Sequence, residues 1–170
     1  MLGDVTSKEE LLNRLKKELK ENPVEEGKWL IGFGYDNTKF EDGLHPTKFD
    51  LDTISTEVPI TVSHASGHLA CVNSKALELY GYAGEDYVVP EGGVVRTIGS
   101  TREANGVLEE NAILDSEKKK VVPAPGFEDV LKAIVKAQKL YASLGITTTQ
   151  DASVEDANHY NYMLGACAQN

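Results

Sequence analysis

The 170-residue chain has little cysteine, no long hydrophobic run and no excess of basic charge. Its two cysteines, Cys71 and Cys167, have no paired spacing, so we expect no disulfide framework. No apolar run approaches the roughly 18 to 20 residues that cross a bilayer, and we expect no membrane partner. A formal net charge of -10 at pH 7 repels phosphate backbones, which argues against a nucleic-acid partner.

The start of the chain, Met1–Asp4, also lacks the features of a secretory leader. It has neither a basic flank nor a long apolar core, so cytoplasmic localisation is expected. What is present is ordinary for a globular protein, with 41% hydrophobic and 26% charged residues. The length suits one domain, or one and a fraction, with a sizeable core.

The reactive side chains do not form a complete metal or nucleophile motif anywhere in the sequence. His64 and His68 are four residues apart, a spacing that shares one metal ion on a helix, but Ser66 and Gly67 between them disfavour a helix. On a continuous strand their rings would lie about 13 Å apart, too far for one ion. Only a sharp bend at Gly67 would bring the two rings together.

Local signals predict the elements of an α+β fold. A capping box at Ser7 and Glu10 starts the first helix, and short β-prone runs bounded by glycine, proline and asparagine indicate strands. In chain order the sequence predicts a helix over 8–21, strands over 29–35, 59–64 and 69–72, a helix that begins at Asn73 or Ser74 and stops at Gly81, a strand over 92–96, and a helix from Gly106 to about Lys120.

A linker at 123–126 divides the chain into two parts. After it, apolar residues recur at helical spacing over 127–144, and the β-prone run 146–150 predicts a strand. We therefore expect an α+β domain over 1–122, with a small mixed sheet and packed helices. We also expect a second part over 123–170, with one helix, one strand and a loosely defined C-terminal tail.

Residues around the second and third strands are the candidate binding site. His68 follows Gly67 and precedes a strand and a helix start, where side chains and backbone N–H groups converge, and one interpretation is that it donates to a substrate oxygen. From the residues alone, a structural histidine that satisfies a loop carbonyl is the favoured interpretation. Asn73 is the other candidate for a substrate contact, and its alternative interpretation is the N-cap of the following helix.

Several segments, taken together and in this order, resemble the metal-dependent amidohydrolase family that contains the YtcJ-like hydrolases and the N-substituted formamide deformylases. They span almost the whole chain. The segments are Gly27–Asp36, Pro46–Thr47 with Asp50–Asp52, Gly67–Leu77, Pro90–Gly93, Gly106–Glu110 and Leu144–Asp151.

The resemblance implies a distorted (β/α)8 barrel whose divalent metal, zinc by expectation, is held by a His-any-His pair, later histidines and a late aspartate. None of that set is present here. The chain then corresponds to the α+β insertion between the first and second barrel strands, and the helix and strand over 127–151 return to the barrel. The resemblance implies that His68 and Asn73 face the substrate, with His64 behind them, and that no metal binds specifically to this chain.

The implied reaction is hydrolysis of an amide-type, non-peptide C–N bond in a small molecule by a metal-activated hydroxide. This chain would shape the pocket, contact the remainder of the barrel and be inactive alone, and an exposed edge would allow homo-oligomers. The alternative is a standalone module that binds a small ligand near Trp29, Tyr35 and His68. The packing of the helix over 127–144 distinguishes the two alternatives. A standalone module would pack this helix on the core of residues 29–77, whereas a fragment would leave an apolar face uncovered.

Overall fold

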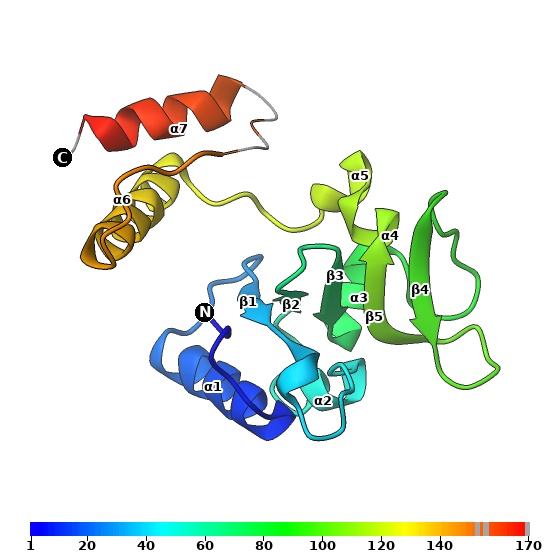
Figure 1. The fold of residues 1–170 in the computed structure, drawn as a ribbon. Helices are drawn as coiled ribbons and strands as arrows, with labels where there is room; N and C mark the ends of the chain where they lie inside the picture. The colour runs from blue at the N-terminus through cyan, green and yellow to red at the C-terminus, as the bar shows by residue number, and fades with distance from the viewer. Residues whose placement is uncertain (152–153, 155–156, 169–170) are drawn as a thin grey trace. The chain divides into compact units, whose positions relative to one another are not determined.

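The structure is a computed structural model that describes residues 1–151, 154 and 157–168. The chain divides into two compact units, Met1–Pro123 and Ala124–Asn170 (Figure 1). The first unit contains every strand of the described residues, and the second contains two helices.

A five-stranded mixed sheet forms the centre of the first unit. Its strand order is β1-β2-β3-β5-β4; β1 runs parallel to β2, and the other neighbours are antiparallel. The predicted mixed α+β fold is therefore confirmed. The strands are β1 (Leu30–Tyr35), β2 (Ile60–His64), β3 (Leu69–Val72), β4 (Gly93–Thr97) and β5 (Ala104–Glu110).

The predicted start of the first helix and the predicted stop at Gly81 are confirmed, because local hydrogen bonds specify both. Helix α1 (Lys8–Glu21) begins where the Glu10 N–H donates to Ser7 Oγ at 3.1 Å. Helix α3 (Ser74–Tyr80) ends at Gly81, which adopts a φ of 77° in the left-handed region. Between β1 and β2 lie the short helices η1 (Asn37–Lys39) and α2 (Lys48–Asp52).

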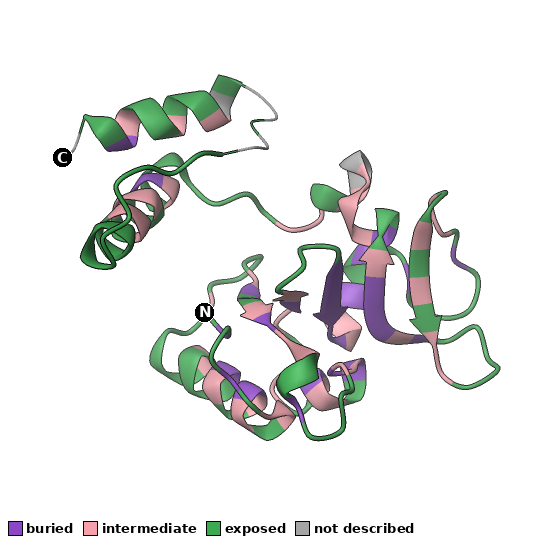
Figure 2. Cartoon of the chain, viewed as in Figure 1, coloured by how far each residue is buried: buried purple, intermediate pink, exposed green. Residues whose placement is uncertain are grey.

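Hydrophobic residues cover both faces of the sheet, and Figure 2 shows the central strands β3 and β5 as largely buried. Because side chains alternate along a strand, β3 and β5 contribute to two separate clusters, whereas the buried hydrophobic residues of β1 and β2 belong to one of them. The cluster on the side of α1 and α2 contains Leu11, Leu15, Leu30, Tyr35, Leu51, Ile60, Val62, Cys71 and Val107. The cluster on the side of α3 contains Val72, Ala76, Leu77, Tyr80, Tyr82, Leu108 and Ala112.

The predicted helix from Gly106 to about Lys120 is wrong in its first part. Residues 104–110 form β5, which pairs with β3 on one side and β4 on the other. Only the short helices α4 (Asn111–Leu114) and α5 (Ser116–Lys119) follow it. Pairing with the neighbouring β4 and the distant β3 outweighs the helical preference of the Leu-Glu-Glu sequence, because tertiary contacts override a weak local propensity.

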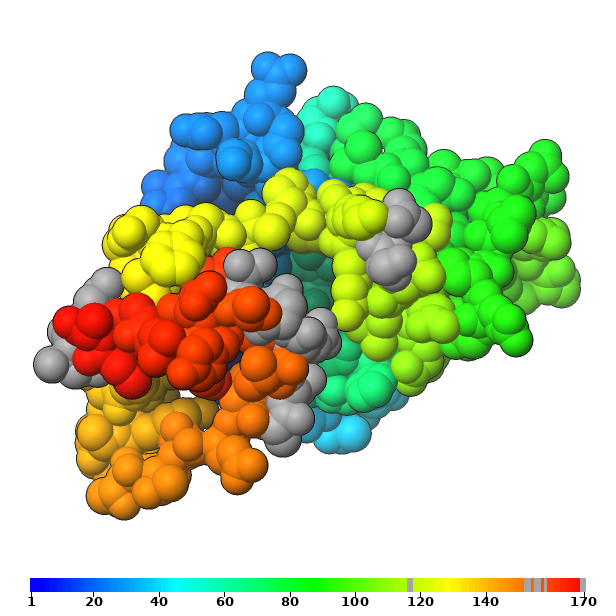
Figure 3. Space-filling view, turned by 90° about the horizontal axis from the view of Figure 1, so that it is seen from above, coloured from blue at the N-terminus to red at the C-terminus, as the bar shows by residue number. Residues whose placement is uncertain are grey.

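The second unit packs α6 (Phe127–Ser143) against α7 (Ala157–Cys167), as Figure 3 also shows. The Phe127 and Tyr162 rings lie 5.1 Å apart. Helix α7 replaces the loosely defined tail that the sequence predicted. The predicted strand over 146–150 is absent, because a strand forms only beside another strand and this unit has none in its described residues.

Many large apolar side chains of the second unit stay exposed. Of its described residues only Leu131 and Ala166 are buried hydrophobics, so the helix pair has almost no core of its own. The exposed residues are Phe127, Leu140, Tyr141, Leu144, Ile146, Tyr160, Met163 and Leu164. Within the described part of the chain, no helix has the length and apolarity needed to cross a membrane.

Candidate functional site

A tight turn between β2 and β3 places the two histidines that the sequence singles out. His64 is the last residue of β2 and His68 directly precedes β3. Gly67 makes the bend, with a φ of 76° and an N–H that donates to the His64 carbonyl at 3.0 Å. The bend is present, yet the two side chains interact with different groups.

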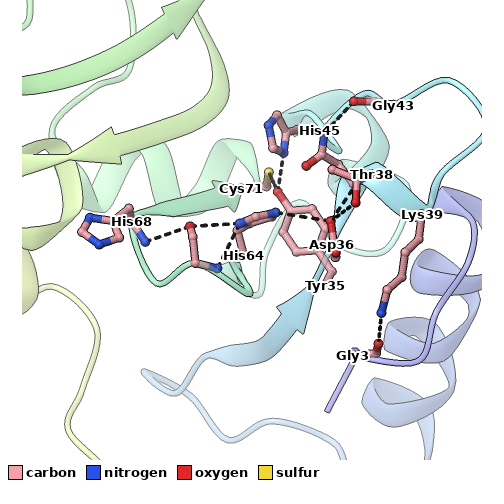
Figure 4. A network of polar contacts seen from close by, with 12 residues as sticks. Gly3, Tyr35, Asp36, Thr38, Lys39, Gly43, His45, His64, His68 and Cys71 are labelled. Carbon is pink, nitrogen blue, oxygen red and sulfur yellow. Dashed lines mark hydrogen bonds and ion pairs between the residues drawn. The ribbon is translucent and has the colours of Figure 1, made fainter. Parts of the chain in front are cut away.

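His64 is partly buried and packs against two aromatic rings. Its ring centroid lies 5.2 Å from that of Tyr35 and 5.7 Å from that of His45, both edge-on (Figure 4). His64 Nδ1 lies 2.9 Å from Ser66 Oγ. Its Nε2 is buried without a hydrogen-bond partner among the described residues. The Asp36 Oδ1 atom lies 3.9 Å from this nitrogen, which is within ion-pair range but too far for a hydrogen bond.

The Tyr35 hydroxyl joins three elements beside His64. It lies 2.8 Å from His45 Nδ1, in the loop before α2, and 3.0 Å from Cys71 Sγ on β3. Burial raises the pKa of the Tyr35 hydroxyl and raises the pKa of Cys71 to about 12. Burial, with smaller effects of Arg96 and His64, lowers the pKa of His45. Tyr35, His45 and Cys71 are therefore neutral near pH 7.

The cluster predicts a strong contrast between the two cysteines. Cys71 is fully buried and its raised pKa disfavours the reactive thiolate, whereas Cys167 is exposed. We expect one thiol per native chain to react with a thiol-specific disulfide reagent and two after denaturation. A Cys167→Ser variant should show none in the native state. Rapid native labelling in that variant would contradict the buried Tyr35–Cys71 contact.

His68 points away from this cluster and lies at the surface (Figure 4). Its Nδ1 is 3.0 Å from Glu110 Oε2, and the side chains are 64% and 50% exposed. The backbone holds both residues in place: the Glu110 N–H donates to the His68 carbonyl at 2.9 Å, and the His68 N–H donates to Ser66 Oγ at 3.2 Å. An open imidazole that is held by a carboxylate can form a hydrogen bond to a ligand with its other ring nitrogen.

Glu110 itself has an unusual backbone conformation. With φ 51° and ψ -128°, it is the one non-glycine residue with a positive φ in the described part of the chain. Such a conformation costs on the order of 1–3 kcal/mol for a residue with a Cβ, and strained residues cluster at functional sites.

Asn73, the other predicted substrate contact, is fully buried. Its Oδ1 accepts from the N–H groups of Ile60 and Ala76, and its Nδ2 donates to the carbonyls of Ser55 and Val58, all within 2.8–3.0 Å. These bonds make it the N-cap of α3 and a link to the loop before β2. Its substrate contact stays a prediction, and it would require these bonds to break.

Sequence reasoning missed two residues of the site, His45 and Glu110. Neither lies in a local motif that marks it, because His45 meets Tyr35 across 10 residues and Glu110 meets His68 across 42. A metal ion needs several such donors around one point. Among the described residues, no three histidine, cysteine, aspartate or glutamate side chains converge in that way, so the residues present do not fit a metal centre.

The fold resembles that of metal-dependent hydrolases. A solved structure described as an uncharacterized metal-dependent hydrolase from Pyrococcus horikoshii OT3 matches 96% of this chain with a TM-score of 0.53 and 25% identity. One from Pyrococcus furiosus, with the same description, matches 99% of this chain with a TM-score of 0.53 and 27% identity. The chain covers 28% and 30% of these proteins.

The family profile described as the amidohydrolase family matches residues 1–169, so the chain belongs to the amidohydrolase family. Among curated relatives, YtcJ of Bacillus subtilis (strain 168) is 32% identical over 105 residues, which are 62% of this chain and 18% of that protein. The N-substituted formamide deformylase of Arthrobacter pascens is 26% identical over 75% of this chain and 24% of its own length. The protein LONG AFTER FAR-RED 3 of Arabidopsis thaliana is 29% identical over 88% of this chain and 24% of its own length.

Proposed function

We propose that this chain is part of a metal-dependent amidohydrolase that cleaves an amide-type, non-peptide C–N bond, and that it shapes the substrate pocket without holding the catalytic metal. The observation that carries the proposal is the family match over residues 1–169 in a chain that spans 18% to 30% of its relatives. The metal and its ligands would lie in the remainder of the enzyme, since the donor set described here does not fit one. The name of the formamide deformylase supports the bond type.

Uncovered apolar surface supports a partner for both units. On β1, Ile31 and Phe33 are 54% and 49% exposed, and the second unit leaves most of its large apolar residues exposed. Large exposed apolar patches mark interaction surfaces in soluble proteins. In the proposal these surfaces contact the remainder of the barrel. The proposal also includes a small-molecule substrate, a cytoplasmic location and a homo-oligomer that forms through the same surface.

The standalone binding module has less support. It requires one pocket near Trp29, Tyr35 and His68, but Tyr35 is fully buried and His68 is at the surface. An open cavity of about 590 Å³ does lie beside Trp29, between α1 and β1. Neither Tyr35 nor His68 lines it, so the expected pocket is not the one that the structure forms.

The proposal predicts that the purified chain has no hydrolase activity with or without added Zn²⁺. Metal activation of water needs a bound metal, and removing the ligands removes the nucleophile. N-benzylformamide and acetanilide would be incubated with the chain and product followed by chromatography, with the Arthrobacter pascens deformylase as the positive control and circular dichroism to verify folding. Zinc-dependent turnover would contradict the inactivity of the chain.

A second experiment tests the family context directly. The genomic DNA on both sides of the reading frame would be sequenced and translated in all frames. The proposal expects a His-any-His pair upstream and further histidines with an aspartate downstream. Unrelated flanking genes with clean stop codons would overturn it in favour of a separate binding module.

A further inference from the structure

We propose that Glu110 is a positioning residue for His68: its carboxylate binds the protonated Nδ1 of the ring, so that the ring presents Nε2 to a ligand as a hydrogen-bond acceptor. This inference rests on the proposed function, in which His68 faces the substrate, and it adds to that site a residue and a direction of hydrogen bonding. It also reverses the sequence-based interpretation in which His68 donates to a substrate oxygen.

The direction follows from the chemistry of the two side chains. An ionised carboxylate has only acceptors, so at 3.0 Å from Glu110 Oε2 the Nδ1 of His68 carries the proton. A neutral imidazole has one N–H and one lone pair, and the bond made by one nitrogen fixes the state of the other. The lone pair is then on Nε2, which accepts from an N–H or O–H group of a ligand.

The fold holds this pair firmly while leaving the ring open. Leu69 and Glu109 are partners in the β3–β5 ladder, and the bond from the Glu110 N–H to the His68 carbonyl extends that ladder by one step. The ring is nevertheless 64% exposed and faces away from His64 (Figure 4). A ring held where two paired interior strands end is more suitable for binding a ligand than one on a mobile loop.

The backbone of Glu110 gives independent support. Glycine adopts a φ of 51° with a ψ of -128° without penalty, so stability alone favours glycine at this position. The neighbouring Glu109 lies in β5 and forms an ordinary ion pair with Arg96. A glutamate retained in a strained conformation, with its carboxylate on an exposed histidine, points to a use for that carboxylate.

The test measures the tautomer of His68 by ¹⁵N NMR of the full chain at about pH 8.5, where a histidine ring is neutral. We expect the proton on Nδ1 in the wild type. Glu110→Gly and Glu110→Ala should both shift the population toward Nε2–H, because both remove the acceptor. Glu110→Gly alone should also raise the melting temperature, by about 2–6 °C, because it relieves the backbone strain. Glu109→Gln is the matched control and should leave the tautomer unchanged.

Two results would overturn the inference. One is a His68 ring with its proton on Nε2 in the wild type, and the other is a tautomer that Glu110→Ala does not change. A melting temperature that falls in Glu110→Gly as in Glu110→Ala would remove the argument from strain. None of these measurements depends on hydrolysis, so the inference can fail while the proposed function stands, and the reverse also holds.

Discussion

Replacing Gly106 with alanine is expected to lower the free energy of unfolding of the sheet unit by at least about 3 kcal/mol. Gly106 lies in β5 with a φ of 99°, a conformation that an L-residue rarely adopts. An added Cβ would lie 2.5 Å from the Val72 carbonyl oxygen and 2.6 Å from the Lys48 backbone nitrogen. Both neighbours are backbone atoms of packed elements, so β3 or α2 would have to move.

Trp29, the single tryptophan, reports on unfolding of this unit in a urea titration followed by fluorescence. Gly43→Ala is the matched control, since Gly43 has a φ of 64° but no heavy atom within 4 Å of the added Cβ. It should cost only about 1–2 kcal/mol, the penalty of the backbone conformation. Equal losses in the two variants would show that β5 does not pass as close to α2 as the structure has it.

Gly106 also illustrates why part of the fold was not predictable from the sequence. The helices α1 and α3 follow from caps within a few residues, such as Ser7 with Glu10 and the stop at Gly81. The strand β5 depends on one partner far away in the chain, because β3 pairs with it across more than 30 residues. Local patterns carry no information about such pairing, so a Leu-Glu-Glu sequence suggests a helix.

The same division applies to the candidate site. The turn at His64 and His68 is visible in the sequence because glycine and serine interrupt a β-prone run. Each ring also contacts a residue remote in the sequence, His45 for His64 and Glu110 for His68, and those contacts exist only after the chain has folded. The site is therefore predictable as a location and not as an arrangement of hydrogen bonds.

Asn73→Ala is expected to lower the free energy of unfolding by about 3–5 kcal/mol, an effect that distinguishes a structural role from a substrate contact. The alanine would leave the buried N–H groups of Ile60 and Ala76 and the partly buried carbonyls of Ser55 and Val58 without their partner. Each unsatisfied buried group costs about 1–3 kcal/mol, although partial relaxation makes the sum smaller. Urea titration with Trp29 fluorescence measures the loss.

Asn111→Ala is the appropriate control, because Asn111 is exposed and its side chain donates one bond, to the Glu91 carbonyl. It should cost less than about 1 kcal/mol. Asn73→Asp separates the accepting from the donating bonds. Its oxygens still accept from the N–H groups of Ile60 and Ala76, but it has no N–H for the carbonyls of Ser55 and Val58. Its loss should therefore lie between that of Asn111→Ala and that of Asn73→Ala in the same urea titration. If Asn73→Ala were as mild as Asn111→Ala, the capping bonds would contribute little, and a direct substrate contact for Asn73 would become the better explanation.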